Sequence, residues 1–73
     1  MINLIIPSLK VNVLLNSYQE VKDYVYSLHN HFEWLRGSTW DWDNSYVEIN
    51  GVRIGRVSYN GTVWDKHNRR VID

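Results

Sequence analysis

Two histidines are the first residues whose spacing raises the question of metal chemistry. His29 and His31 are two positions apart, and on a helix this step turns the second side chain about 200° around the axis. The two imidazoles therefore cannot chelate one ion. His67 has no predictable partner, so we expect no metal site.

Two aspartates could, by their type, support acid–base work. Asp41 and Asp43 point the same way if their segment is extended, but the sequence holds no second group opposite them. The segment also fails as an EF-hand loop that starts at Asp41. Tyr46 stands at the sixth position, which needs glycine, and Val52 at the twelfth, which needs glutamate. We interpret the segment as a turn whose side chains bond to nearby backbone amides.

Other catalytic signatures are missing from the 73 residues. There is no cysteine, no glycine-rich phosphate loop and no serine in a nucleophile motif. A chain of this size also has little room for a water-excluding pocket. We therefore predict that the protein is not an enzyme and has no catalytic residues, no metal ligands and no cofactor.

Aromatic and arginine side chains are the residues that could bind a partner, since Trp, Tyr and Arg are the usual anchors of interfaces. Trp40 and Trp42 alternate with aspartates in a predicted loop. Two interpretations stay open: one or both rings cover a small core, or both form a protein-binding patch. Tyr26 should be exposed on the predicted helix. The predicted partner-binding residues are Tyr26, Trp40, Trp42, Arg53, Arg56, Arg69 and Arg70.

The formal net charge is zero, which argues against a strongly electrostatic nucleic-acid binder. Acidic residues nonetheless dominate from Glu33 to Glu48 and basic residues from Arg53 to Arg70, so two faces of opposite sign are expected. The basic run is interleaved with aromatic residues, which also fits a stacking surface for nucleic acid. The final segment, HNRRVID, is interpreted as a solvated tail or as a segment that orders on a partner.

One amphipathic helix is predicted at about 18–36. Ser17 and Glu20 have the spacing of a capping box, and Gly37 is expected to end the helix as a left-handed C-cap. The apolar stripe consists of Val21, Val25, Leu28, Phe32 and Leu35.

Extended segments are predicted on both sides of this helix. Before it, strands at 2–6 and 9–15 are separated by Pro7. The apolar side chains of Ile2, Leu4 and Ile5 could alternatively anchor to a partner. After the helix, Asn-Gly dipeptides at 50–51 and 60–61, each expected to form a type I′ turn, predict a three-stranded antiparallel meander at about 45–50, 52–59 and 62–67.

The register of this meander follows from the turns. The first hairpin sets Val47 opposite Ile54 and Glu48 opposite Arg53, the second an attractive cross-strand charge pair. A bulge near Gly55 is expected because the apolar phase of the middle strand shifts there. If the second hairpin keeps its register, Trp64 lies on the same sheet face as Val57.

These elements predict an α+β fold in a single domain, residues 1–73. It comprises N-terminal strands, one amphipathic helix packed on a sheet face, and a C-terminal three-stranded antiparallel meander with two Asn-Gly turns. The apolar N-terminus lacks a basic region and is broken by Pro7 and Lys10, so neither a signal peptide nor a membrane span is expected. We expect a cytoplasmic protein with no membrane partner, which the absence of cysteine suits.

The chain resembles small phage-encoded transcription regulators that bind the RNA polymerase of the bacterial host. The resemblance covers the full length and the pattern of MINLIIPSLKVNVLL, SYQEVKDYVYSLHNHFEWLRG and SYVEINGVRIGRVSYNGTVW. It implies contact with the large polymerase subunits in the cytoplasm of the bacterial host, inhibition of initiation from host promoters, and antitermination. It assigns no functional residue.

The function expected from these observations is that of a non-enzymatic, protein-binding regulator. Two alternatives remain open. One is an inhibitor of a bacterial defence system, such as an anti-CRISPR or anti-restriction protein. The other is a small nucleic-acid-binding regulator that uses the basic meander. A purely structural subunit would instead self-associate.

Overall fold

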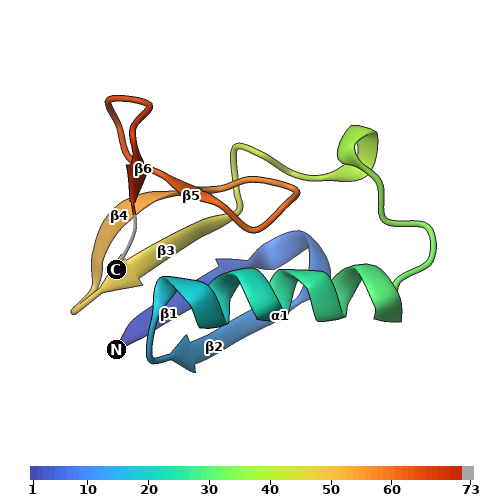
Figure 1. The fold of residues 1–73 in the computed structure, drawn as a ribbon, viewed down its shortest axis with the longest axis horizontal. Coiled ribbons are helices and arrows are strands. Elements are labelled where there is room, and N and C mark those ends of the chain that lie inside the picture. The colour runs from blue at the N-terminus through green and yellow to red at the C-terminus, as the bar shows by residue number, and fades with distance from the viewer. Residues whose placement is uncertain (72–73) are drawn as a thin grey trace.

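A six-stranded antiparallel sheet carries the single helix on one face (Figure 1). The structure is a computed structural model that describes residues 1–71. The spatial order of the strands is β2-β1-β3-β4-β5-β6. The strands are β1 (Ile2–Ile6), β2 (Val11–Leu15), β3 (Tyr46–Ile49), β4 (Val52–Val57), β5 (Val63–Trp64) and β6 (Arg70–Val71), and the helix is α1 (Tyr18–His31). The α+β class is confirmed, with more strands than predicted.

The N-terminal strand β1 lies inside the sheet, between β2 and β3. Its inward side chains Ile2, Leu4 and Ile6 are at most 5% exposed. A one-turn 3₁₀ helix, Pro7–Leu9, and a left-handed residue, Lys10, reverse the chain into β2. The idea that the N-terminus is a partner-binding arm is therefore wrong, because β1 is needed to fill the core.

The helix begins as predicted and ends earlier. Ser17 accepts the Glu20 amide, and Glu20 accepts the amide of Asn16, the residue before the N-cap, which is a variant of the predicted capping box. The last helical residue is His31, and Phe32 is an extended cap. The predicted end at 36 is wrong because the chain turns at Phe32, whose carbonyl accepts the Leu35 amide. Leu35 then reaches the core from a loop and is 2% exposed.

The helix and the inward side chains of the sheet form one hydrophobic core. In β1, β2 and β3 these side chains alternate with outward ones, as the period of two requires. The core consists of Ile2, Leu4, Ile6, Val11, Val21, Val25, Leu28, Leu35, Trp40, Val47, Val57 and Val63. The helix covers only this inner face, so the sheet has an outer face that the helix leaves open.

The β3–β4 hairpin contains the bulge that the sequence indicated. Glu48 pairs with Arg53 and Val47 pairs with Gly55, so Ile54 is the extra residue. Asn50 and Gly51 have φ values of 53° and 79°, both in the left-handed region.

The two later turns differ from the prediction and change the register. Between β4 and β5 only Gly61 has positive φ, 84°, and the Ser58 carbonyl accepts the Gly61 amide, so a type I′ turn at Asn60-Gly61 is wrong. The longer turn pairs Val57 with Val63 and sets Trp64 on the opposite face, where the prediction had Trp64 beside Val57. A further hairpin joins β5 to β6, and residues 72–73 of the final segment lie outside the described residues.

Candidate partner-binding site

A row of side chains crosses the outer face of the sheet from edge to edge. The pairing places Ile5 opposite Tyr46, Tyr46 opposite Arg56, and Arg56 opposite Trp64. Because residues directly opposite in antiparallel strands project to the same side, these four side chains share the outer face. Asn12 and Arg70 stand opposite Ile5 and Trp64 in the two edge strands, but the Arg70 side chain lies on the helix side of the sheet.

A cavity of about 490 Å³ lies on this face. We call it the outer cleft. The loop before β3 contributes one wall, β4 the floor, and the β5–β6 turn the other wall. Its lining residues are Trp42, Asp43, Arg53, Ile54, Gly55, Arg56, Trp64, Asp65, Lys66 and Asn68.

Two arginines in the outer cleft lie over aromatic rings. The Arg53 guanidinium carbon is 4.5 Å from the centre of the Tyr46 ring, and that of Arg56 is 5.4 Å from the centre of the Trp42 ring. Both distances are within the range of a cation–π contact. The rings thus hold the two guanidinium groups on the outer face while leaving N–H donors for other acceptors.

Asp43 connects the loop wall to both arginines. Its backbone carbonyl accepts a 3.2 Å hydrogen bond from Arg53, and its carboxylate lies 3.5 Å from Arg56. The side chains of this ion pair are 47% (Arg56) and 82% (Asp43) exposed. A pair exposed to this degree is screened by water and contributes little to stability, so the contact can be exchanged.

Gly55 allows strand β5 to pack closely against strand β4 in the outer cleft. A Cβ on Gly55 would overlap the Trp64 carbonyl oxygen and lie 3.2 Å from the Asp65 Cα. Since these are backbone atoms, no rotation of a side chain could relieve the overlap. Glycine is therefore required for β5, and with it Trp64, to lie against β4.

Asp65 fixes the turn that forms the second wall. Its Oδ1 accepts the amides of Arg69, at 3.0 Å, and His67, at 2.8 Å. The Arg69 amide is the main cause that holds the pKa of the Asp65 carboxyl below its ordinary value; desolvation opposes this, and the His67 amide adds to it. Asn68 closes the turn with a φ of 59°.

The alternating tryptophans separate onto different sides of the molecule. Trp40 is 9% exposed, and its indole nitrogen donates a 2.9 Å hydrogen bond to the Val57 carbonyl. The Trp42 amide bonds to the Trp40 carbonyl, and this tight turn reverses the direction of the next ring. Trp40 is therefore part of the core, whereas Trp42 lines the outer cleft.

Tyr26 belongs to a second aromatic group, on the helix side, which we call the histidine cluster: Tyr26, His29, Trp40 and Tyr59. The His29 ring lies 4.2 Å from that of Tyr59, and its Nε2 is 2.5 Å from the Tyr59 carbonyl oxygen. Tyr26 meets His29 edge-on and is 54% exposed. The structure thus places Tyr26 away from the outer cleft.

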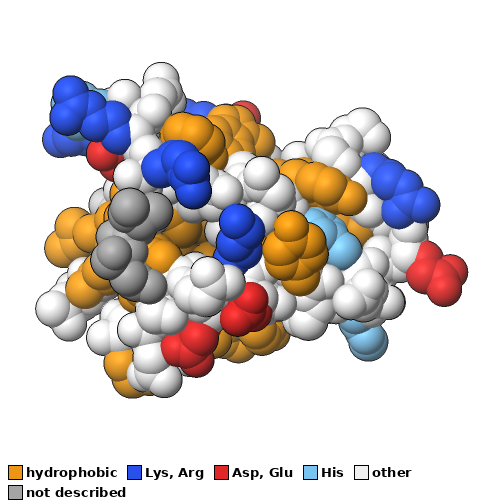
Figure 2. Space-filling view, in the orientation of Figure 1, with side chains coloured by type: hydrophobic (Ala, Val, Ile, Leu, Met, Phe, Trp, Pro, Cys, Tyr) orange, Lys and Arg blue, Asp and Glu red, His pale blue; other side chains and the backbone are white. Residues whose placement is uncertain are grey.

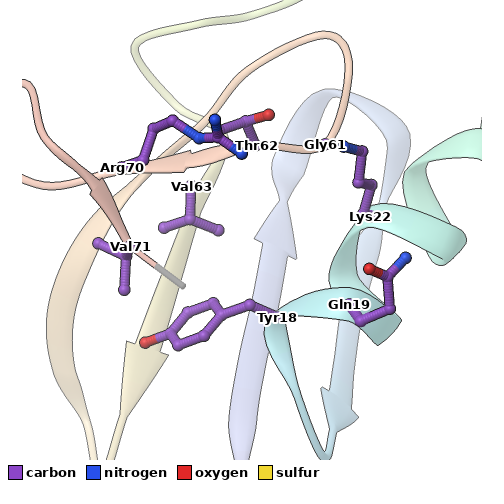
Figure 3. Close-up of a pocket in the computed structure, with 8 residues that line it drawn as sticks. All are labelled: Tyr18, Gln19, Lys22, Gly61, Thr62, Val63, Arg70 and Val71. Atoms are coloured by element: carbon purple, nitrogen blue, oxygen red, sulfur yellow. The ribbon is translucent and has the colours of Figure 1, made fainter. Parts of the chain in front are cut away.

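The last two predicted residues also lie apart from the outer cleft. Arg69 is exposed in the β5–β6 turn. Arg70 lines a smaller cavity of about 270 Å³ beside the first turn of α1, where it extends toward Thr62 across from Tyr18 (Figure 3). Basic side chains gather at this hairpin on the helix side (Figure 2). Of the seven predicted residues, only Trp42, Arg53 and Arg56 are brought together.

Tyr46, Trp64 and Lys66 are cleft-region residues that the sequence prediction did not include. In the sequence Tyr46 only breaks the pattern of a calcium loop, and the expected register sets Trp64 on the wrong sheet face. An available signal was Asp65 followed by Asn68, because Asp favours the start of a turn and Asn tolerates a left-handed conformation. That signal would have placed a hairpin here.

Among residues 1–71, no group of three or more His, Cys, Asp or Glu side chains could hold a metal ion. No helix within the described chain combines the length and apolarity needed to cross a bilayer. Comparison with known proteins finds no matching family model, no significantly similar curated protein and no significantly similar solved structure.

Proposed function

We propose that this protein is a non-enzymatic regulator that binds another protein through the outer cleft. The observation that carries the proposal is the convergence of Trp42, Arg53 and Arg56 on the sheet face that the helix leaves open. Arginine and tryptophan are the residue types that most often dominate binding energy.

The specific partner that we propose is bacterial RNA polymerase. In this proposal the chain is a phage protein that contacts the large polymerase subunits in the host cytoplasm, inhibits initiation from host promoters and causes antitermination. The support for this partner is the resemblance of the strand, helix and turn pattern to phage transcription regulators. If the protein instead inhibits a bacterial defence system, it would use the same cleft to bind a different target protein.

The size of the protein is compatible with a stoichiometric interface. A standard interface buries roughly 800 Å² of each partner, and the accessible surface of this chain is 4865 Å². Such an interface would cover the outer cleft and much of the row from Ile5 to Trp64. A protein of this size therefore acts by occupying a surface.

Single-stranded nucleic acid is the second candidate ligand, and one observation favours it. Arg53, Arg56 and Lys66 line the same cleft as two tryptophans, a combination that can hold phosphates and stack bases. Against it, Asp43 lies within the cleft and Glu48 lies opposite Arg53, so a continuous polyanion meets carboxylates along the same face.

A capture experiment tests the proposal. The tagged full chain is incubated with bacterial lysate, washed at high salt, and the retained proteins are identified by mass spectrometry. We expect the large polymerase subunits in stoichiometric amounts. Trp42→Ala and Arg56→Ala should each reduce retention, because they remove an aromatic anchor and a charged donor.

Two matched variants serve as controls. Trp34→Ala removes a tryptophan that lies outside the cleft and is 56% exposed. Arg69→Ala removes an arginine of the β5–β6 turn that does not line the cleft. Both should retain the partner like the unmodified chain. Retention of a nuclease or another defence complex would replace polymerase as partner, and recovery of nucleic acid alone would contradict protein binding.

A further inference from the structure

We propose that the outer cleft binds an acidic segment of the partner protein, and that a carboxylate of this segment replaces Asp43 at Arg56. This inference rests on the proposed protein-binding function and specifies the chemistry of the partner. It follows from the charges in the cleft, from the partners that each charge has, and from the exposure of the Asp43–Arg56 ion pair.

The cleft has more available positive than negative charge. Three cationic side chains line it, Arg53, Arg56 and Lys66. Of its two carboxylates, Asp65 is already bonded to the backbone amides of the β5–β6 turn. Asp43 is therefore the carboxylate left to face these cations, and within residues 1–71 its carboxylate forms an ion pair with Arg56, at 3.5 Å.

The contact between Asp43 and Arg56 is suited to exchange. The Asp43 side chain is 82% exposed, so water solvates it equally well after it leaves. Arg56 stays in position because its guanidinium lies over the Trp42 ring. An incoming carboxylate can accept two parallel N–H bonds from a guanidinium, which a single contact at 3.5 Å does not supply.

The surroundings favour a peptide with separate carboxylates over a nucleic-acid strand. Carboxylates border the cations on the same face, with Asp43 in the loop wall and Glu48 opposite Arg53. A strand with a phosphate at every nucleotide would be repelled at these positions. A peptide can present a carboxylate to Arg56 and an apolar side chain to the tryptophans that line the cleft, with neutral residues elsewhere.

The test uses NMR titration of the ¹⁵N-labelled full chain with two synthetic peptides. One carries several Glu residues and one Phe, and the other has Gln at every Glu. The Nε–H signals of Arg53 and Arg56 and the indole signal of Trp42 report the site directly. We expect the Glu peptide to shift these signals and to bind at least about threefold more tightly than the Gln peptide.

The sign of one substitution distinguishes exchange from simple attraction. Asp43→Asn should tighten binding of the Glu peptide about threefold, because Arg56 loses its internal competitor. Asp41→Asn removes the same charge two residues away, outside the cleft lining, and should change the affinity less. Arg56→Gln should weaken binding about fivefold, whereas Arg69→Gln should leave it unchanged.

Three results would overturn the inference: equal affinity for the Gln peptide, weaker binding by Asp43→Asn, or tighter binding of an eight-nucleotide thymidine strand at the same signals. Its failure is separable from that of the proposed function. If polymerase is captured equally by the unmodified chain and Arg56→Gln, the partner stands and the acidic segment is wrong. If the Glu peptide binds as expected and no polymerase is captured, only the partner is wrong.

Discussion

The outer cleft and the histidine cluster use similar residues in opposite ways. In the histidine cluster two ring nitrogens bond within the protein, the Trp40 indole to the Val57 carbonyl and His29 Nε2 to the Tyr59 carbonyl, while His29 Nδ1 is buried without a hydrogen bond. In the outer cleft the guanidinium groups of Arg53 and Arg56 keep donors that solvent or a partner can reach. Aromatic rings that bond to the backbone of the protein stabilise the fold. Aromatic rings that lie beside solvent-facing hydrogen-bond donors can bind a partner.

This difference also shows why aromatic content alone is a poor guide to function. Trp40 and Trp42 are two residues apart, yet one is 9% exposed and the other 36%. The neighbours of each ring decide its role. The predictions below separate the two regions by changing one residue in each, beginning with the change that should cost most.

Gly55→Val should break the outer cleft and destabilise the protein by about 3 kcal/mol, because the side chain overlaps the β5 backbone and cannot be accommodated by a rotamer. Urea denaturation followed by far-UV circular dichroism measures the loss. Gly37→Ala is the matched control, since its Cβ would have no atom within 4 Å. Equal stability of the two variants would contradict the tight approach of β4 and β5.

Trp40→Phe should destabilise the fold by about 2 kcal/mol, and Trp42→Phe by less than about 0.5 kcal/mol. The first leaves the buried Val57 carbonyl without its donor and removes core volume; the second changes an exposed ring. Thermal or urea unfolding of both variants tests the contrast. Similar losses would mean that Trp42 also supports the core.

His29→Leu should cost about 1 kcal/mol, because the helix loses its hydrogen bond to the turn between β4 and β5. His31→Leu is the matched control, on an exposed position of the same helix. Hydrogen exchange at Gly61 and Thr62 should accelerate only in the His29 variant. Equal exchange in both would show that the contact does not hold the turn.

The β5–β6 turn should loosen in acid, which is the smallest effect expected. A folded-state pKa below the unfolded value means that Asp65 contributes stability above the unfolded value of about 3.9, and that the contribution is lost as pH falls through the folded pKa. The amide signals of His67 and Arg69 should follow this titration by NMR. In Asp65→Ala they should not, while the histidine cluster should remain unchanged in both proteins.

The parts of the fold that could be predicted depend on local signals. Ser17 and Glu20 identified the start of the helix because a capping box is a contact between residues three apart. Glu48 and Arg53 were paired correctly because the turn between them is short. The end of the helix was missed because Phe32 and Leu35 keep helical spacing in the sequence, and only packing of Leu35 from a loop satisfies the core.

The site could be predicted in part, since residue type selected Trp42, Arg53 and Arg56. Residue type could not show that the Trp40 indole donates to the carbonyl of Val57, a residue 17 positions away. It also could not show that Trp64 lies on the sheet face opposite to the predicted one. The second error came from one turn: Asn60 lacks a positive φ, so the hairpin is longer than the dipeptide indicated. A face assignment in a strand is reversed by a shift of one residue.

The position of β1 has a consequence for how the chain is made. β1 leaves the ribosome before the other strands of this sheet, and β2 can pair with it soon after. Its other neighbour, β3, follows about 40 residues later. Until then one side of an apolar strand has open hydrogen-bonding groups, which can pair with another nascent chain. The early emergence of α1, whose apolar stripe covers the inner face of that hairpin, would shield its side chains during the wait.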